Sequence, residues 1–104
     1  MRFENYTALV TGGSSGIGTE VCLQLAAEGA HVGVVASANA GKAQIVVDKI
    51  MQAGGKATAL VGDVAKPESV AKLVKDAAAA LGPIDILINA AGVIFAPTAA
   101  PIGR

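Results

Sequence analysis

The fold is decided by the stretch Thr11-Gly12-Gly13-Ser14-Ser15-Gly16-Ile17-Gly18. An apolar run over residues 6–10 precedes it, and a segment with helical spacing follows it. A strand, a glycine-rich turn and a helix in this order predict a nucleotide site. The glycines allow a close approach to the backbone, and the helix that starts near Gly16 directs free N–H groups at an anion. A pyrophosphate suits that place, and a tight turn without a ligand is the alternative.

The rest of the chain alternates between strand-like runs and helical spacing. Strands are predicted over residues 6–10, 31–36, 56–61 and 85–89, and helices over about 16–28, 40–53 and 67–81. This α/β alternation implies right-handed crossovers and a parallel sheet. The expected strand order is 3-2-1-4, which puts the glycine turn beside the switch point. Residues 1–95 are predicted to form the domain, and residues 96–104, with two prolines and no periodicity, an irregular tail.

Composition excludes several classes of function. The 104 residues are 53% hydrophobic and carry a formal net charge of zero, so neither nucleic acid nor a membrane surface is an expected partner. No signal segment or membrane span is recognised, which predicts a cytoplasmic protein. Cys22 is the only cysteine and is predicted to be a core residue in a reducing compartment. His31 is interpreted as a strand-end histidine, and no metal site is predicted.

The glycine spacing differs from the common Gly-x-Gly-x-x-Gly fingerprint and resembles that of the short-chain dehydrogenase/reductase family. Two further motifs follow in order. Residues 62–64 read Gly-Asp-Val after the third strand, as in the family. Residues 89–92 read Asn-Ala-Ala-Gly and resemble the family's Asn-Asn-Ala-Gly, with Ala90 in place of the second Asn. The resemblance covers residues 3–95 and is strongest to β-ketoacyl-carrier-protein reductases and related ketone reductases.

The resemblance implies a Rossmann-type three-layer sandwich, truncated after the fourth strand, that binds a dinucleotide. In the family the acid at position 63 typically accepts a hydrogen bond from the adenine amino group. The alternative is that it caps the following turn. The residues implied in cofactor binding are Gly12, Ser14, Ser15, Gly16, Ile17, Gly18, Ser37, Asp63, Val64, Asn89, Ala90, Ala91 and Gly92.

The end of the second strand bears on the choice of cofactor. A carboxylate there would bind the ribose 2′-OH and repel a 2′-phosphate, but residues 35–39 contain no acid. Ser37 and Asn39 are possible phosphate partners, and Lys42 is the nearest cation. NADP is therefore favoured over NAD, and an Asp placed at Ala36 is expected to reverse the order. If Ser37 and Asn39 only cap and turn the chain, either cofactor is compatible.

No residue is assigned as catalytic. The family reduces a carbonyl with a Ser and a Tyr-x-x-x-Lys pair beyond the fourth strand, whereas here the only tyrosine, Tyr6, is followed at the Lys position by Val10. One hypothesis is the cofactor-binding part of an oxidoreductase that transfers hydride between NADP(H) and a carbonyl or alcohol, with the substrate bound only by a full-length form. A second is a non-catalytic module that binds a nucleotide or a partner, and a third is a broken gene product with no activity. In each case this chain alone is expected to be inactive and, because strand 85–89 is an apolar edge, to self-associate or need a partner.

Overall fold

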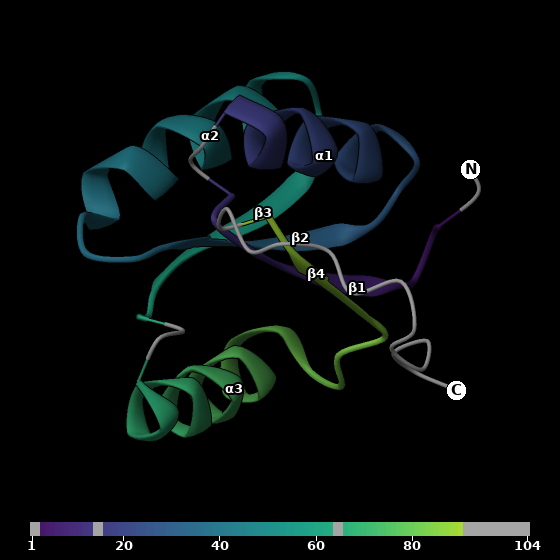
Figure 1. Ribbon diagram of the computed structural model, residues 1–104. Coiled ribbons are helices and arrows are strands. Elements are labelled where there is room, and N and C mark those ends of the chain that lie inside the picture. Colours follow the sequence, from purple (N-terminus) through teal and green to yellow (C-terminus); the bar gives the residue numbers. More distant parts are fainter. Residues whose placement is uncertain (1–2, 14–15, 64–65, 91–104) are drawn as a thin grey trace, which may run out of the picture.

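The structure is a computed structural model that describes residues 3–13, 16–63 and 66–90. Its elements alternate along the chain: β1 (Thr7–Thr11), α1 (Gly16–Ala27), β2 (His31–Ala36), α2 (Ala40–Gln52), β3 (Lys56–Val61), α3 (Pro67–Leu81) and β4 (Ile86–Asn89). All strand pairs are parallel, in the order β3-β2-β1-β4. Figure 1 shows α1 and α2 on one face of the sheet and α3 on the other. The predicted three layers and strand order are confirmed.

A polar side chain sets the start of α2, and a proline sets that of α3. The Asn39 side chain accepts a hydrogen bond from the Gly41 N–H at 2.8 Å, so Asn39 is the N-cap of α2. In α3, Pro67 occupies the start of the helix, and the cap residue is Lys66, without a capping side chain. Pro67 lacks an N–H, so one of the donors that a cap would satisfy is absent from this helix.

The first and fourth strands each start one residue later than predicted. Asp85, expected inside the fourth strand, instead precedes β4 and binds the start of β1. Its carboxylate Oδ2 accepts the Thr7 N–H at 2.8 Å, and its own N–H donates to the Thr7 carbonyl at 2.9 Å. A charge-assisted bond of this kind is stronger than a neutral one, so Asp85 fixes the register between the two strands.

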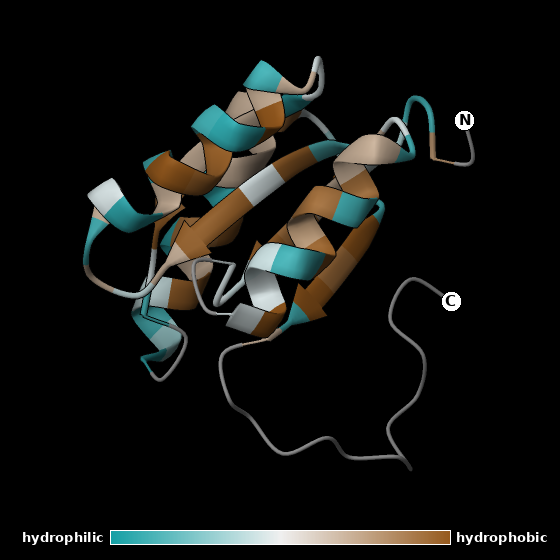
Figure 2. Ribbon diagram, turned by 90° about the horizontal axis from the view of Figure 1, so that it is seen from above, coloured by the Kyte–Doolittle hydropathy of each residue, from teal (hydrophilic) through white to brown (hydrophobic). Residues whose placement is uncertain are grey.

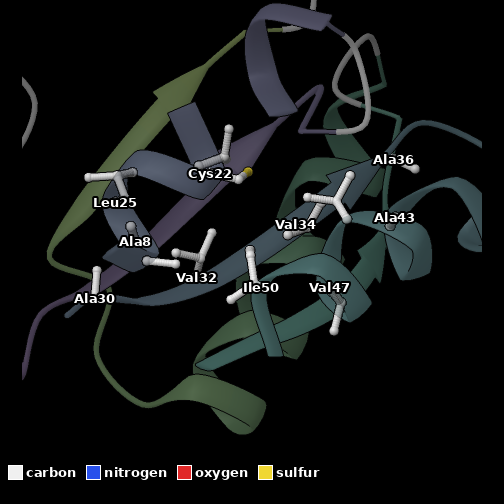
Figure 3. Close-up of a cluster of buried hydrophobic side chains, with 13 residues drawn as sticks. Ala8, Cys22, Leu25, Ala30, Val32, Val34, Ala36, Ala43, Val47 and Ile50 are labelled. Carbon is white, nitrogen blue, oxygen red and sulfur yellow. The ribbon is translucent and has the colours of Figure 1, made fainter. Parts of the chain in front are cut away.

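The core lies on both faces of the sheet, as expected for parallel strands. Under α1 and α2, aliphatic side chains of β1 and β2 pack against Cys22 and Ile50 (Figure 3). Under α3, a smaller cluster contains Leu9, Val35, Leu73 and Ala77. Figure 2 shows apolar residues along the strands and polar residues on the outer turns of the helices. No helix within the described residues is long and apolar enough to cross a membrane.

Candidate functional site

The carboxyl ends of β1 and β4 bring two of the sequence motifs together. Thr11 and Asn89 are register partners, and the Thr11 hydroxyl donates to Asn89 Oδ1 at 2.9 Å across 78 residues of sequence. The same hydroxyl lies 3.3 Å from the Ile88 carbonyl, and the Ala90 N–H donates to the Thr11 carbonyl at 2.8 Å. The start of the glycine turn and the start of the Asn-Ala-Ala-Gly motif are thus fixed to each other.

The glycine turn is packed too tightly for side chains at two of its positions. Gly12 has a positive φ of 70°, and a Cβ on Gly18 would overlap the Gly12 carbonyl oxygen. A Cβ on Gly13 would lie 2.9 Å from Cγ1 of Val34. The Gly13 N–H donates to the Val35 carbonyl at 3.0 Å, which fastens the turn to β2. Gly18 and Gly13 are therefore needed by the fold itself.

Gly16 differs from these glycines. Beyond its chain neighbours and the backbone of its own helix, no described residue places a heavy atom within 4 Å of the position that its Cβ would take. It begins α1, and neither it nor the rest of the first turn carries an acidic side chain. The next residue, Ile17, leaves 77% of its surface exposed. The N-terminus of α1 thus combines an open space with backbone N–H groups and the positive end of the helix dipole, which suits an anion.

The link from β2 to α2 forms the second part of the site. Ala36, the last residue of β2, is 2% exposed and belongs to the core (Figure 3). An Asp at position 36 would be buried in this core. The expectation that an Asp at Ala36 distinguishes NAD from NADP therefore placed the acid at the wrong residue. Ser37 is the first exposed side chain after β2. Asn39 uses its Oδ1 to cap α2, and Lys42 is exposed in the first turn.

The end of β3 lies beside that of β2. The Gly62 N–H donates to the Ala36 carbonyl at 3.0 Å, which places the half-buried Asp63 next to the β2 end. A Cβ on Gly62 would lie 2.9 Å from Cδ2 of Leu73, so this glycine also lets α3 approach the sheet. The described residues of all three motifs therefore lie at the carboxyl edge of one sheet.

The outcome for the predicted site residues is mixed. The structure brings eight of them to the carboxyl edge: Gly12, Gly16, Ile17, Gly18, Ser37, Asp63, Asn89 and Ala90. The other five lie outside the described residues: Ser14, Ser15, Val64, Ala91 and Gly92. Sequence reasoning missed Thr11 and Thr19, whose hydroxyl donates to the Gly13 carbonyl at 3.1 Å. The sequence signal for both residues was a threonine on each side of the glycine turn.

The amino ends of the strands form the opposite edge of the sheet, where the structure places His31 and a hollow. His31 opens β2 there, and its Nε2 lies 3.2 Å from the Thr58 hydroxyl. Partial burial, with a smaller contribution from the Lys56 charge, lowers the pKa of His31 below its usual value. A hollow of about 430 Å³ lies at this edge, and Tyr6 is among the residues that line it. In the part of the chain that the structure describes, no three His, Cys, Asp or Glu side chains are grouped to hold a metal.

A parallel sheet in this order, with a glycine turn at its switch point, defines a Rossmann-type α/β domain. Within that class the family is given by sequence comparison. Residues 6–102 match the family model described as short chain dehydrogenase, and the chain belongs to this family.

Relatives extend well beyond this chain. It is 40% identical over 89 residues to the 3-oxoacyl-acyl-carrier-protein reductase of Staphylococcus epidermidis, covering 86% of this chain and 36% of that protein. It is also 40% identical over 92 residues to the 7alpha-hydroxysteroid dehydrogenase of Escherichia coli, covering 88% and 36%. The solved short-chain dehydrogenase/reductase of Serratia marcescens superposes with a TM-score of 0.84 at 38% identity, over 89% and 38%. The chain therefore spans a little over a third of the length of each.

Proposed function

We propose that this chain is the NAD(P)-binding N-terminal part of a short-chain dehydrogenase/reductase. The oxidoreductase would transfer hydride between NADP(H) and a carbonyl or alcohol substrate. The observation that carries the proposal is the open space at Gly16, beside a turn in which Gly13 and Gly18 are closely packed. Gly16 is exposed, so no packing contact within the fold requires a glycine there, in contrast to Gly13 and Gly18. A bound pyrophosphate fills such a space.

Different residues of the site would bind different parts of a dinucleotide. Backbone N–H groups at the start of α1, from Gly16 and Ile17 together with the proposed Ser14 and Ser15, would hold the pyrophosphate. Asp63, with Val64, would accept the adenine amino group, because a carboxylate is an acceptor and that amino group is a donor. Residues 89–92 would line the nicotinamide side. The dinucleotide itself supplies the hydride, and no residue of this chain is assigned a proton transfer.

NADP(H) is the proposed cofactor, with NAD(H) as the alternative. Ser37 is the first exposed residue after β2, and no carboxylate stands there to repel a 2′-phosphate. Lys42 lies exposed in the first turn of α2, within an element whose N-terminus also favours anions. The Asn39 Oδ1 is occupied by the cap, so only its amide NH₂ remains as a donor toward a phosphate.

We propose the carbonyl or alcohol substrate only for a longer protein, one that also contains the remaining two-thirds of the relatives' length. The names of the relatives include a reductase and a dehydrogenase, which supports this class of reaction. Tyr6 precedes β1 at the amino edge of the sheet, remote from Asn89 at the carboxyl edge, which supports its exclusion as a catalytic residue. A cytoplasmic location completes the proposal, supported by the buried, unpaired Cys22.

A titration of the chain with NADPH, in which the fluorescence of NADPH is measured, tests the proposal. We expect weak binding that Gly16→Val abolishes, because the new side chain occupies the space of the pyrophosphate. Ala27→Val is the control, since it places the same side chain at the exposed far end of the same helix. Equal affinity of the wild type and Gly16→Val would show that this turn does not hold the nucleotide. Binding without turnover of carbonyl substrates is expected of this chain in either hypothesis.

The alternative, a non-catalytic nucleotide-binding or partner-binding module, predicts the same titration result. The two hypotheses are distinguished by assaying a longer protein of the family that contains this chain. NADPH oxidation with a carbonyl substrate supports the oxidoreductase. Retained binding without oxidation supports the module.

A further inference from the structure

The carbonyl of Gly13, in the glycine turn, is held by a side chain of α1. The Thr19 hydroxyl donates to this carbonyl at 3.1 Å, across six residues of sequence. The Gly13 N–H donates to the Val35 carbonyl of β2 at 3.0 Å. Both backbone groups of Gly13 therefore have a partner, one on the helix and one on the sheet.

The Thr19 hydroxyl bonds further back along the chain than is usual for a threonine in a helix. Such a hydroxyl commonly donates to the carbonyl three or four positions earlier. Thr19 is the fourth residue of α1, and its hydroxyl reaches the residue six positions earlier, outside the helix. Branching at Cβ restricts χ1 of threonine, so the direction of the hydroxyl is firmly set. This side chain thus stabilises the turn that leads into α1.

A packing contact beside this bond joins the same two segments. Gly18 lies so close to Gly12 that a Cβ on Gly18 would overlap the Gly12 carbonyl oxygen. Because Gly18 precedes Thr19 and Gly12 precedes Gly13, the packing contact and the hydrogen bond are adjacent. Together they fix the first turn of α1 against the glycine turn. The backbone N–H groups of that helical turn are the ones proposed to hold the pyrophosphate, and their direction follows that of the helix.

The bond from Thr19 also controls the direction of a dipole. A carbonyl oxygen carries a partial negative charge, so a carbonyl that turns toward a pyrophosphate repels it. The Thr19 hydroxyl engages the Gly13 oxygen from α1 and stabilises that orientation of the peptide. Loss of the donor frees this peptide to rotate, which lowers the affinity of the turn for an anion.

We propose that Thr19 is a positioning residue for the pyrophosphate of the dinucleotide. Its hydroxyl fixes the Gly13 carbonyl, and with it the glycine turn, relative to the helix N-terminus that binds the phosphates. Thr19 acts through Gly13 and not by touching the cofactor. The inference rests on the proposed function, because it concerns the same nucleotide site.

Thr19→Val tests this role, because valine keeps the shape and the helix propensity of threonine but lacks the donor. In fluorescence titrations we expect NADPH to bind about fivefold more weakly, the change that corresponds to one net hydrogen bond. NADH should weaken by the same factor, since both dinucleotides carry the pyrophosphate. Thr19→Ser keeps the hydroxyl and should bind within about twofold of the wild type. Thr19→Ala, a better helix former without the donor, should reproduce the loss seen with valine.

Thr58→Val is the matched control for Thr19→Val. It makes the same substitution at another half-buried threonine, whose hydroxyl contacts His31 at the opposite edge of the sheet. Circular dichroism and urea unfolding verify that each variant is folded during the titration. A loss of stability alone leaves the affinity of a folded chain unchanged, so Thr58→Val should bind NADPH as the wild type does.

The outcomes separate this inference from the proposed function. Wild-type affinity in Thr19→Val and Thr19→Ala would overturn the positioning role and leave the proposed function intact. A loss confined to one of the two dinucleotides, or an equal loss in Thr58→Val or Thr19→Ser, would also overturn it. A wild type that bound neither NADPH nor NADH would overturn the proposed function, and this inference with it.

Discussion

The Thr11 hydroxyl, at the carboxyl end of β1, donates a 2.9 Å hydrogen bond to Oδ1 of Asn89, at the carboxyl end of β4. The pair joins the residue before the glycine turn to the first residue of the Asn-Ala-Ala-Gly motif. The hydrogen bond from Thr11 directs the Oδ1 of Asn89 toward the end of β1. Two motifs that the sequence separates are thereby oriented as one unit at the site proposed for the dinucleotide.

Thr11→Val tests the role of this pair. Valine keeps the shape of threonine but removes the donor, so the free energy of unfolding should fall by about 1 kcal/mol. NADPH binding should weaken by roughly fivefold, the same free energy expressed as affinity. Urea unfolding and NADPH titration measure the two effects.

Thr58→Val is the control for Thr11→Val. It removes a hydroxyl that contacts His31 at the opposite edge of the sheet. It should lower stability by a similar amount and leave NADPH affinity unchanged. If both variants weakened NADPH binding equally, the effect of Thr11→Val would reflect general destabilisation rather than the orientation of Asn89.

Gly18→Ala and Gly16→Ala should separate fold from binding. A Cβ at Gly18 meets the Gly12 carbonyl oxygen, a backbone atom that cannot move away, so we expect a loss of more than about 2 kcal/mol in unfolding free energy. A Cβ at Gly16 meets nothing within 4 Å, so stability should stay within about 0.5 kcal/mol of the wild type while NADPH affinity falls. Thermal unfolding with and without NADPH gives both quantities. A strongly destabilised Gly16→Ala would contradict the assignment of an open cradle.

Ser37→Asp should reverse the order of cofactor affinities. The side chain at position 37 is exposed, so a carboxylate there stays ionised and repels the 2′-phosphate of NADP(H). It also accepts the ribose 2′-OH of NAD(H). Ser37→Asn keeps the size without the charge and is the control. Tighter binding of NADH than NADPH by the unmodified chain would contradict the proposed cofactor.

The sequence predicted the fold well because its signals are local. Glycines and Pro67 mark the ends of helices, and mainly apolar runs of four to six residues mark the strands, so element order and strand order followed. The misplaced details depend on contacts distant in sequence. The sheet register, and not the spacing of residues, determines that Asp85 binds Thr7. It also determines that Ala36 points into the core while Ser37 does not. Thr11 was missed as a site residue for the same reason, because its partner lies 78 residues away.

The stability of the chain should fall as the pH is lowered from 7.5 toward 5.5. Partial burial, and to a lesser extent Lys56, lower the pKa of His31 in the folded state. Below the ordinary histidine pKa of about 6.5, the unfolded chain therefore binds a proton more readily than the folded chain does. Stability is fully present above that pH and is lost as the pH falls toward the folded pKa. Urea midpoints measured across this range should decline for the wild type and stay nearly level for His31→Gln. Lys56→Met should show a shallower decline than the wild type, since it removes one of the two causes. An equally steep decline in His31→Gln would assign the pH dependence to other groups.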